Sequence, residues 1–220
     1  MFTEPLVFPL GHPMGPFHQH RGEPPSYWVV RLGWDSPLLP DQVSADVWTL
    51  AHGLPDLVHE EPWTRSALRA AAVEAGIHDS DTVLDTLVER GLVVELSPGT
   101  EEAAEFARTH RVQSLLLGLG QQPERPGVDG IGLLGMPALA QVHAATYEFW
   151  QWGHLWPTLA EAAEGLAEMA AQAPQHTRHQ ADPAAVLDRL FRELHVLLCG
   201  NAVYLDRSLA VADAARNTAG

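Results

Sequence analysis

Two histidines near the N-terminus, His18 and His20, have the spacing of a metal-ligand pair. Residues two apart on a β-strand project to the same side of it, so both imidazoles could bind one ion. The same residues also fit an extended, solvent-exposed arm that binds no metal, because residues 1–25 are rich in proline, glycine and histidine. We adopt this second interpretation, and we expect no cofactor.

A second group of residues with chemical potential is the aromatic segment 143–156. On a helix, residues at positions i, i+4 and i+7 share one face, so this segment could line a small-molecule pocket in which histidine acts as acid or base. It could equally form a domain core or an interface, where aromatic side chains are common. The spacing specifies no reaction. The candidate pocket residues are His143, Tyr147, Trp150, Trp152, His154 and Trp156.

Several catalytic classes are excluded by the residue inventory. All thirteen basic residues are arginines, so a Walker-type phosphate loop and Schiff-base chemistry lack their lysine. The sequence has no G-x-S-x-G motif of the kind that presents a nucleophilic serine. Cys199 lies in an apolar helix end, where an inert thiol is expected. The glycines at 130, 132 and 135 have dinucleotide-loop spacing, but a strand is not predicted before them. We predict an ordered loop there.

The net charge of −15 disfavours nucleic acid as a partner. Binding to phosphates depends on clustered positive charge that releases counterions, and neither half of this sequence has a basic excess. No apolar run approaches the roughly 20 residues that cross a bilayer, so no membrane partner is expected. A single cysteine and the lack of a secretory signal predict a cytoplasmic location.

Helical spacing and turn residues predict three helices at about 40–51, 64–75 and 79–90, with strands at 27–34 and 92–96. This order is typical of a winged helix. Further helices are expected at 100–117, 137–152, 157–172 and 183–199, with a glycine-rich loop at 118–135. The predicted fold class is therefore mostly α with a small β component. The predicted parts are an arm at 1–25, a winged-helix-like domain at 26–99, a helical domain at 100–210 and a tail at 211–220.

The third predicted helix is acidic on its polar face, which carries Asp81, Asp85 and Glu89. In a DNA-binding helix-turn-helix this face enters the major groove, where carboxylates are repelled by phosphates. The positive charge available for contacts with a DNA backbone is limited to Arg65, Arg69 and Arg90.

Residues 27–96 resemble the PqqD-like family of peptide-recognition domains. The resemblance rests on the N-terminal strand, the helix that ends in Ala51-His52-Gly53, and the segment from Val83 to Val93. The arm, the longer link at 54–62 and the large C-terminal domain depart from that family. The resemblance implies that a partner peptide adds as a strand beside residues 29–32, where Val29 and Arg31 would contact it.

The sequence thus favours a non-enzymatic winged-helix protein that binds a protein or peptide partner. One alternative is a DNA-binding transcriptional regulator that forms a homodimer through its C-terminal helices. Another is an enzyme or small-molecule sensor that uses the aromatic segment 143–156.

Overall fold

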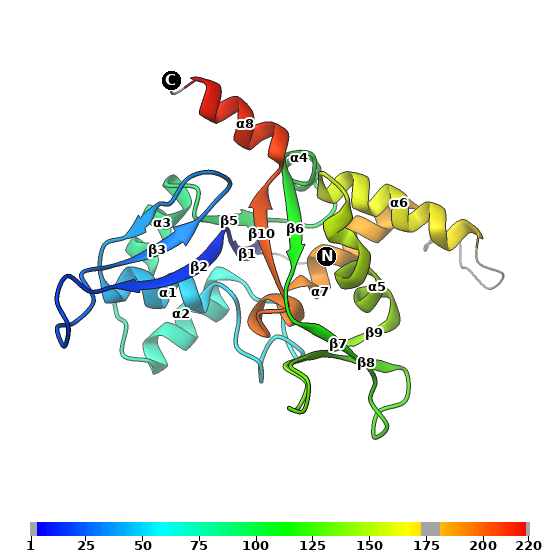
Figure 1. Cartoon of the computed structure of the whole chain (residues 1–220), viewed down its shortest axis with the longest axis horizontal. Helices are drawn as coiled ribbons and strands as arrows, with labels where there is room; N and C mark the ends of the chain where they lie inside the picture. The colour runs from blue at the N-terminus through cyan, green and yellow to red at the C-terminus, as the bar shows by residue number, and fades with distance from the viewer. Residues whose placement is uncertain (1–3, 173–180, 219–220) are drawn as a thin grey trace. The chain divides into compact units, whose positions relative to one another are not determined.

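The computed structural model describes residues 4–172 and 181–218, and the chain divides into two compact units (Figure 1). The first unit consists of Met1–Ser97 together with Leu205–Gly220, and the second is Pro98–Tyr204. The predicted arm and the predicted tail therefore belong to the same unit. Residues 1–3 of that arm, 173–180 of the predicted helical domain and 219–220 of that tail lie outside the described residues.

Two small antiparallel sheets form the β part of the first unit. Strand β1 (Leu6–Pro9) pairs with β5 (Val93–Leu96), which lies more than 80 residues further along the chain. The second sheet has the order β2-β3-β4, formed by β2 (His12–Phe17), β3 (Tyr27–Arg31) and β4 (Leu38–Leu39). The long β2–β3 hairpin is the blue ribbon pair in Figure 1. Strand β3 is consequently the central strand of its sheet.

Three helices complete most of the first unit: α1 (Gln42–Leu50), α2 (Arg65–Glu74) and α3 (Ser80–Glu89). Each helix buries an apolar face against the others; Trp48 of α1, Leu68 of α2 and Leu84 of α3 are all buried. The last helix, α8 (Leu209–Thr218), follows the return of the chain to this unit. The order α1, α2, α3, β5 follows the predicted helix-turn-helix pattern within two residues at each boundary.

The first turn of α1 is stabilised by Asp41, whose side chain accepts a hydrogen bond from the backbone N–H of Ser44 at 2.7 Å. Replacement of an N-cap acid by alanine costs about 1 kcal/mol. We expect Asp41→Ala to lower the free energy of unfolding by about that amount in urea titrations. Asp41→Asn retains the acceptor oxygen, so its midpoint is expected to stay near that of the wild type. Equal losses in both variants would contradict the capping role.

The second unit combines a three-stranded sheet with a helical layer. After α4 (Glu101–Thr109) the sheet has the order β7-β8-β9, all antiparallel. Strand β6 pairs with β10, which begins in this unit at Val203. The remaining elements are β6 (His110–Ser114), β7 (Leu117–Gln121), β8 (Val128–Gly132), β9 (Ala140–His143), α5 (Ala144–Trp152), a 3-10 turn η1 (Gly153–Leu155), α6 (Leu159–Gln172), α7 (Pro183–Cys199) and β10 (Val203–Arg207).

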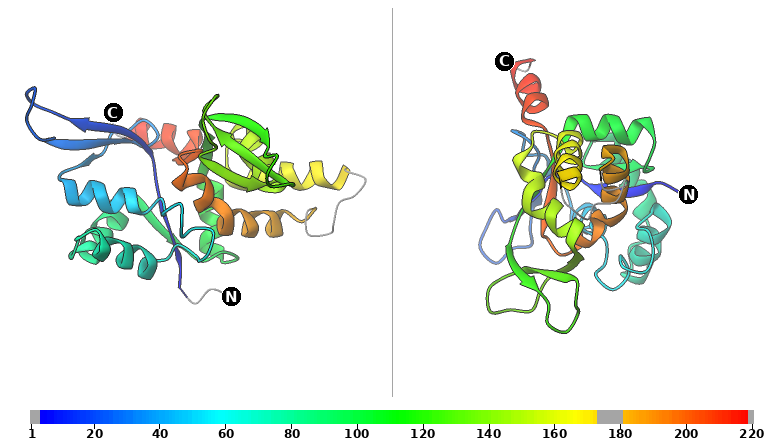
Figure 2. Two further views of the ribbon diagram at one scale, coloured as in Figure 1. Left: turned by 90° about the horizontal axis from the view of Figure 1, so that it is seen from below. Right: turned by 90° about the vertical axis from the view of Figure 1, so that its right-hand side faces the viewer.

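Helices α5, α6 and α7 enclose the core of the second unit. Phe149 of α5, Leu166 of α6 and Leu194 of α7 are all buried. Helices α6 and α7, drawn in yellow and orange, run side by side in Figure 2. Proline is the first residue of α7, where its missing N–H costs no intrahelical hydrogen bond.

The prediction of a mostly α fold is wrong. The chain is 44% helix and 23% strand, with eight helices and four small antiparallel sheets among the described residues, which is a mixed α and β composition. The strands arise where prolines and glycines suggested arm or loop: β1 and β2 fall in 1–25, and β8 and all of β7 except its first residue fall in 118–135. Strands β1, β2 and β7 are edge strands, which tolerate such residues when hydrogen bonds to a neighbouring strand hold them, whereas the central strand β8 contains glycine but no proline. The expected helix 100–117 ends at Thr109 because β6 replaces its second half.

Candidate partner-binding surface

The helix-turn-helix of the first unit presents a polar face opposite its buried stripe. Thr64 caps α2 by accepting a hydrogen bond from the N–H of Ala67, and Gly76, with φ of 80°, allows the turn toward α3. Because Leu68 and Leu87 point into the core, the charged residues of both helices are directed outward. These charged residues define the surface that the sequence assigned to a partner.

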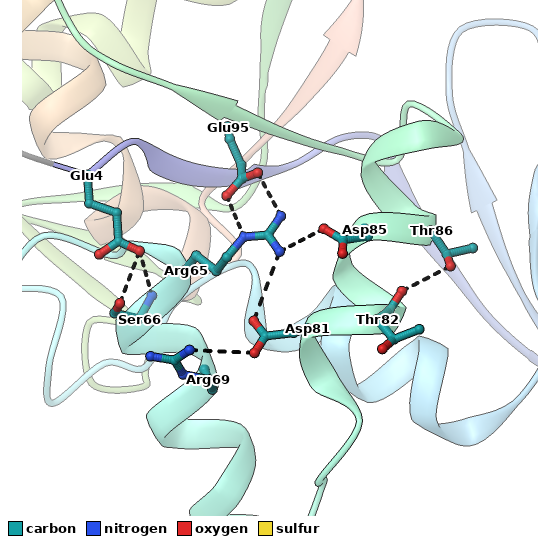
Figure 3. Close-up of polar contacts among 9 residues, drawn as sticks. All are labelled: Glu4, Arg65, Ser66, Arg69, Asp81, Thr82, Asp85, Thr86 and Glu95. Carbon is teal, nitrogen blue, oxygen red and sulfur yellow. Dashed lines mark hydrogen bonds and ion pairs between the residues drawn. The ribbon is translucent and has the colours of Figure 1, made fainter.

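Arg65 is the centre of an ion-pair network on this surface (Figure 3). Its Nε and Nη2 donate to the two carboxylate oxygens of Glu95 on β5 at 2.9 and 2.8 Å, a bidentate arrangement. Its Nη1 donates to Asp85 of α3 at 2.7 Å. These hydrogen bonds, the one to Glu95 first, raise the pKa of the Arg65 guanidinium although partial burial opposes them. Arg65 therefore joins α2 to both α3 and β5.

Arg69 and Arg90 are engaged in the same way. Arg69 lies 3.6 Å from Asp81, which is also 4.0 Å from Arg65 (Figure 3). Arg90 donates to the backbone oxygen of Leu38 on β4 at 2.6 Å. All three arginines that a DNA-backbone contact would require thus have acceptors within the first unit. A phosphate would have to compete with acceptors already in place.

Carboxylates of this surface remain exposed to solvent. The side chain of Asp85 is 60% exposed even though it accepts from Arg65. Glu89 is exposed and forms no hydrogen bond or ion pair with any residue that the structure describes. From Glu60 to Glu95 the sequence has eight carboxylates and three arginines. The surface keeps a net negative charge after its internal pairs are formed.

A surface cleft of about 380 Å³ adjoins the start of α2. Glu4 lies on one side of it and accepts hydrogen bonds from the backbone N–H and the hydroxyl of Ser66 (Figure 3). Glu61 contributes a second carboxylate, and the small side chains of Ala67 and Ala70 leave the space open. The cleft continues the acidic character of the α2–α3 surface.

Strand β3, where the sequence placed the partner peptide, offers no free edge. It pairs with β2 along its length, and Trp28 and Val29 pair with β4 on the other side. Val29 is half-buried. The strand-addition site predicted beside Val29 is therefore wrong, because hydrogen bonds of the same sheet occupy both sides of that strand.

Arg31, also predicted to contact the partner, lies 3.6 Å from the buried carboxylate of Asp206. On the neighbouring strand His12 stands opposite Arg31. Burial lowers the pKa of His12, the Arg31 guanidinium lowers it further, and Asp206 opposes both. Asp206 also accepts the backbone N–H groups of Gly33 and Arg207. This cluster fastens the chain after residue 205 to the β2–β3–β4 sheet.

The histidines proposed as metal ligands lie beyond the end of β2, so the strand alternation that would align them is absent. The Nδ1 of His18 lies 2.8 Å from the backbone oxygen of Glu23, and His20 is exposed. Among the described residues, no group of three or more histidines, cysteines, aspartates or glutamates has a geometry that could hold a metal ion.

The aromatic segment does not converge on a pocket. Trp150 is buried, and its indole N–H donates to the backbone oxygens of Leu115 and Ala202, so it is a core residue. Tyr147 packs against Trp150 with ring centroids 5.3 Å apart, and Trp156 packs against Gly165. The remaining members of the predicted set are exposed: His143, Trp152 and His154.

A cavity does exist between α5, α6 and α7, but it measures about 50 Å³, enough for a few water molecules. None of the six predicted residues lines it; Thr146, Arg189 and Glu193 do. The hydroxyl of Thr146 donates to the carboxylate of Glu193. In the sequence these polar residues gave no signal, because their spacing matches ordinary positions on a helix surface.

Cys199 is half-buried, and burial raises the pKa of its thiol to about 11. The thiolate, which is the nucleophilic form, is therefore scarce at neutral pH, in agreement with the inert thiol expected from the sequence.

Sequence reasoning missed Glu95, Glu4 and Asp206 as interacting residues. Asp206 was detectable in principle, since it is a carboxylate directly after the apolar run from Ala202 to Leu205. Glu4 and Glu95 carry no such signal.

None of the helices in the described parts of the chain combines the length and the apolar character needed to cross a membrane. Comparison of the chain with protein-family models, with curated proteins and with solved structures finds no match.

Proposed function

We propose that this chain is a non-enzymatic binding protein whose α2–α3 surface holds a basic segment of a protein or peptide partner. The observation that carries the proposal is the state of the three arginines of this surface. Each is engaged by an acceptor within the first unit, while Asp85 and Glu89 remain directed to solvent. A surface of this charge attracts cationic groups and repels polyanions.

The cleft beside α2 supports the same partner class. With carboxylates at Glu4 and Glu61 and small apolar side chains between them, it has room for one long cationic side chain. The strand-addition mode is not part of the proposal, because β3 is occupied on both sides.

Fluorescence anisotropy with two labelled probes tests the proposal: an arginine-serine peptide and a glutamate-serine peptide of equal length. We expect the basic peptide alone to bind, with an affinity that falls as salt is raised because exposed charges are screened. The double variant Asp85→Gln, Glu89→Gln is expected to bind about fivefold more weakly, since an exposed charge pair contributes roughly 0.2–1 kcal/mol.

The matched control is Glu164→Gln, Glu168→Gln, which removes two exposed carboxylates from α6 in the second unit. This control is expected to retain the affinity of the wild type. Equal weakening in both double variants would show that net charge alone attracts the peptide, and the proposal would then fail. A mobility shift with duplex DNA at about 50 mM salt would instead favour the transcriptional-regulator alternative.

A further inference from the structure

Strand β7 is one of the two edge strands of the β7–β8–β9 sheet in the second unit, and β8 lies in the middle. The N–H of Gln122 donates to the oxygen of Val128, so residue 122 faces β8 and the preceding Gln121 directs its own N–H away from it. No hydrogen bond from the described residues reaches that outward group. The edge is therefore available for another strand.

This edge lacks proline and charged side chains, two of the features that keep exposed strands from pairing, although its pairing with β8 shifts register between Gly118 and Gly120. β7 has the sequence LGLGQ, with no proline and no charged residue. The other three-stranded sheet differs: its edge strand β2 carries Pro13 and Pro16, and Arg90 donates to the outer side of β4 at Leu38. The β2 and β4 edges of that sheet thus carry proline or an arginine contact, whereas the β7 edge carries neither proline nor charge.

Exposed apolar side chains gather at the end of the same sheet. Leu117 begins β7 and lies opposite Gly132, where the β8–β9 loop starts. We call Leu117 and this loop the apolar tip. Leu134 is 76% exposed, the highest value among the exposed large apolar residues of the described chain. The exposed members of the apolar tip are Leu117, Leu133, Leu134, Met136 and Leu139. A gathering of this kind is typical of an interaction surface.

The distribution of charge over the chain indicates which partner can bind the β7 edge and the apolar tip. The chain carries −15, so two copies repel each other over most of their surface. Residues 115–143 are the exception, because their only charged side chains are Glu124, Arg125 and Asp129. An identical copy can therefore approach here without the opposition it meets elsewhere. An antiparallel edge is also self-complementary, since a two-fold axis pairs it with itself.

We propose that a second copy of this chain binds this surface. The β7 strands of the two copies pair antiparallel about a two-fold axis and join the two three-stranded sheets into one, with an apolar tip at each end of the shared seam. This surface is distinct from the C-terminal helices, which the sequence suggested for dimerisation.

Sedimentation velocity tests the proposal on the full chain from about 1 to 100 μM, a range that brackets a Kd of about 10 μM. We expect the mass to rise with concentration from 24.0 kDa toward twice that value. Gln121→Pro removes the outward N–H and leaves the Gln122–Val128 bond, so the dimer Kd is expected to rise at least about tenfold. Leu134→Asp places a charge in the apolar tip of each copy and is expected to have a similar effect.

Met169→Asp is the matched control, because it changes an exposed apolar residue of α6 in the same unit and should leave Kd unchanged. If circular dichroism shows that the proline variant is unfolded, Leu134→Asp decides the outcome alone. A chain that stays at 24.0 kDa throughout overturns the proposal. A dimer that persists in both Gln121→Pro and Leu134→Asp also overturns the proposal.

Discussion

Asp206→Ala is expected to lower the free energy of unfolding of the first unit by about 3 kcal/mol, because a buried carboxylate with charge-assisted hydrogen bonds is removed. The side chain of Asp206 is fully buried and accepts the N–H of Gly33 at 2.6 Å and that of Arg207 at 3.0 Å. Without it, the N–H of Gly33 loses its acceptor and Arg31 loses its carboxylate partner. Urea titration at pH 7, followed by tryptophan fluorescence, measures the loss.

Asp213→Ala provides the control for this experiment. Asp213 also lies in the segment after residue 205 and accepts the indole N–H of Trp34 at 2.8 Å, but it is exposed. Its loss is expected to cost below about 1 kcal/mol, as for other exposed polar contacts. A similar small cost for Asp206→Ala would mean that the cluster does not hold the C-terminal segment in place.

The second large effect concerns pH. His52 is buried at the end of α1, where its ring packs edge-on to Trp48 and its Nδ1 lies within hydrogen-bonding distance of the backbone oxygens of Trp48 and Thr49. Burial lowers the pKa of His52 from 6.5 to about 4, and the two backbone contacts oppose this shift only in part. The folded state therefore favours the neutral imidazole.

The sign of the stability change follows from this depressed pKa. Below pH 6.5 the unfolded state takes up a proton that the folded state accepts only near pH 4, so stability is complete above pH 6.5 and falls as the pH is lowered toward 4. The full loss is about 3 kcal/mol at 1.36 kcal/mol per pKa unit. Urea titrations at pH 7.5, 6, 5 and about 4 follow it across that window.

His52→Asn retains an N–H donor for the helix carbonyls and removes the titrating group. Carboxylates also titrate in this range, so the informative quantity is the difference between the two pH profiles. We expect that difference to shrink as the pH falls from 6.5 to 4. His59 is exposed, so the control variant His59→Asn is expected to keep the wild-type dependence of stability on pH. Parallel profiles for wild type and His52→Asn would refute the assignment.

Elements set by local sequence were predictable. Helix α7 begins at Pro183 and ends at Cys199 as expected, because proline at the first turn and a strong apolar stripe define it within the sequence itself. The same holds for α2, which is bounded by the Thr64 cap and Gly76. Capping residues and periodicity act within a few residues, so single-sequence reasoning detects them.

The strands were missed because their stabilising partners are distant. Residues 117–121 and 128–132 contain glycine at every second or third position, a composition that predicts loop, yet they pair with each other and with β9. Strand β1 depends on β5, and the position of β10 depends on a contact between Gly33 and Asp206 that spans 173 residues of sequence. Long-range pairing leaves no periodic trace in a short window.

The sequence indicated which charged residues lie on the α2–α3 surface, but it did not indicate which of them contact one another. The acidic positions of α3 and the arginines of α2 were identified from helical spacing. That Arg65 would bind Glu95, 30 residues away, depends on how β5 is placed beside α2. Local spacing predicts which face a side chain occupies, whereas the partner on that face comes from tertiary structure.

Because the first unit is made from both ends of the chain, its parts leave the ribosome far apart in time. Residues 98–204 are contiguous and are synthesised completely before the strand that carries Asp206 appears. Domains fold as units during synthesis, so the inserted unit can reach its native state while the surrounding one still lacks its last segment. The unit that carries the acidic surface would then be completed only after the segment from residue 205 has been synthesised.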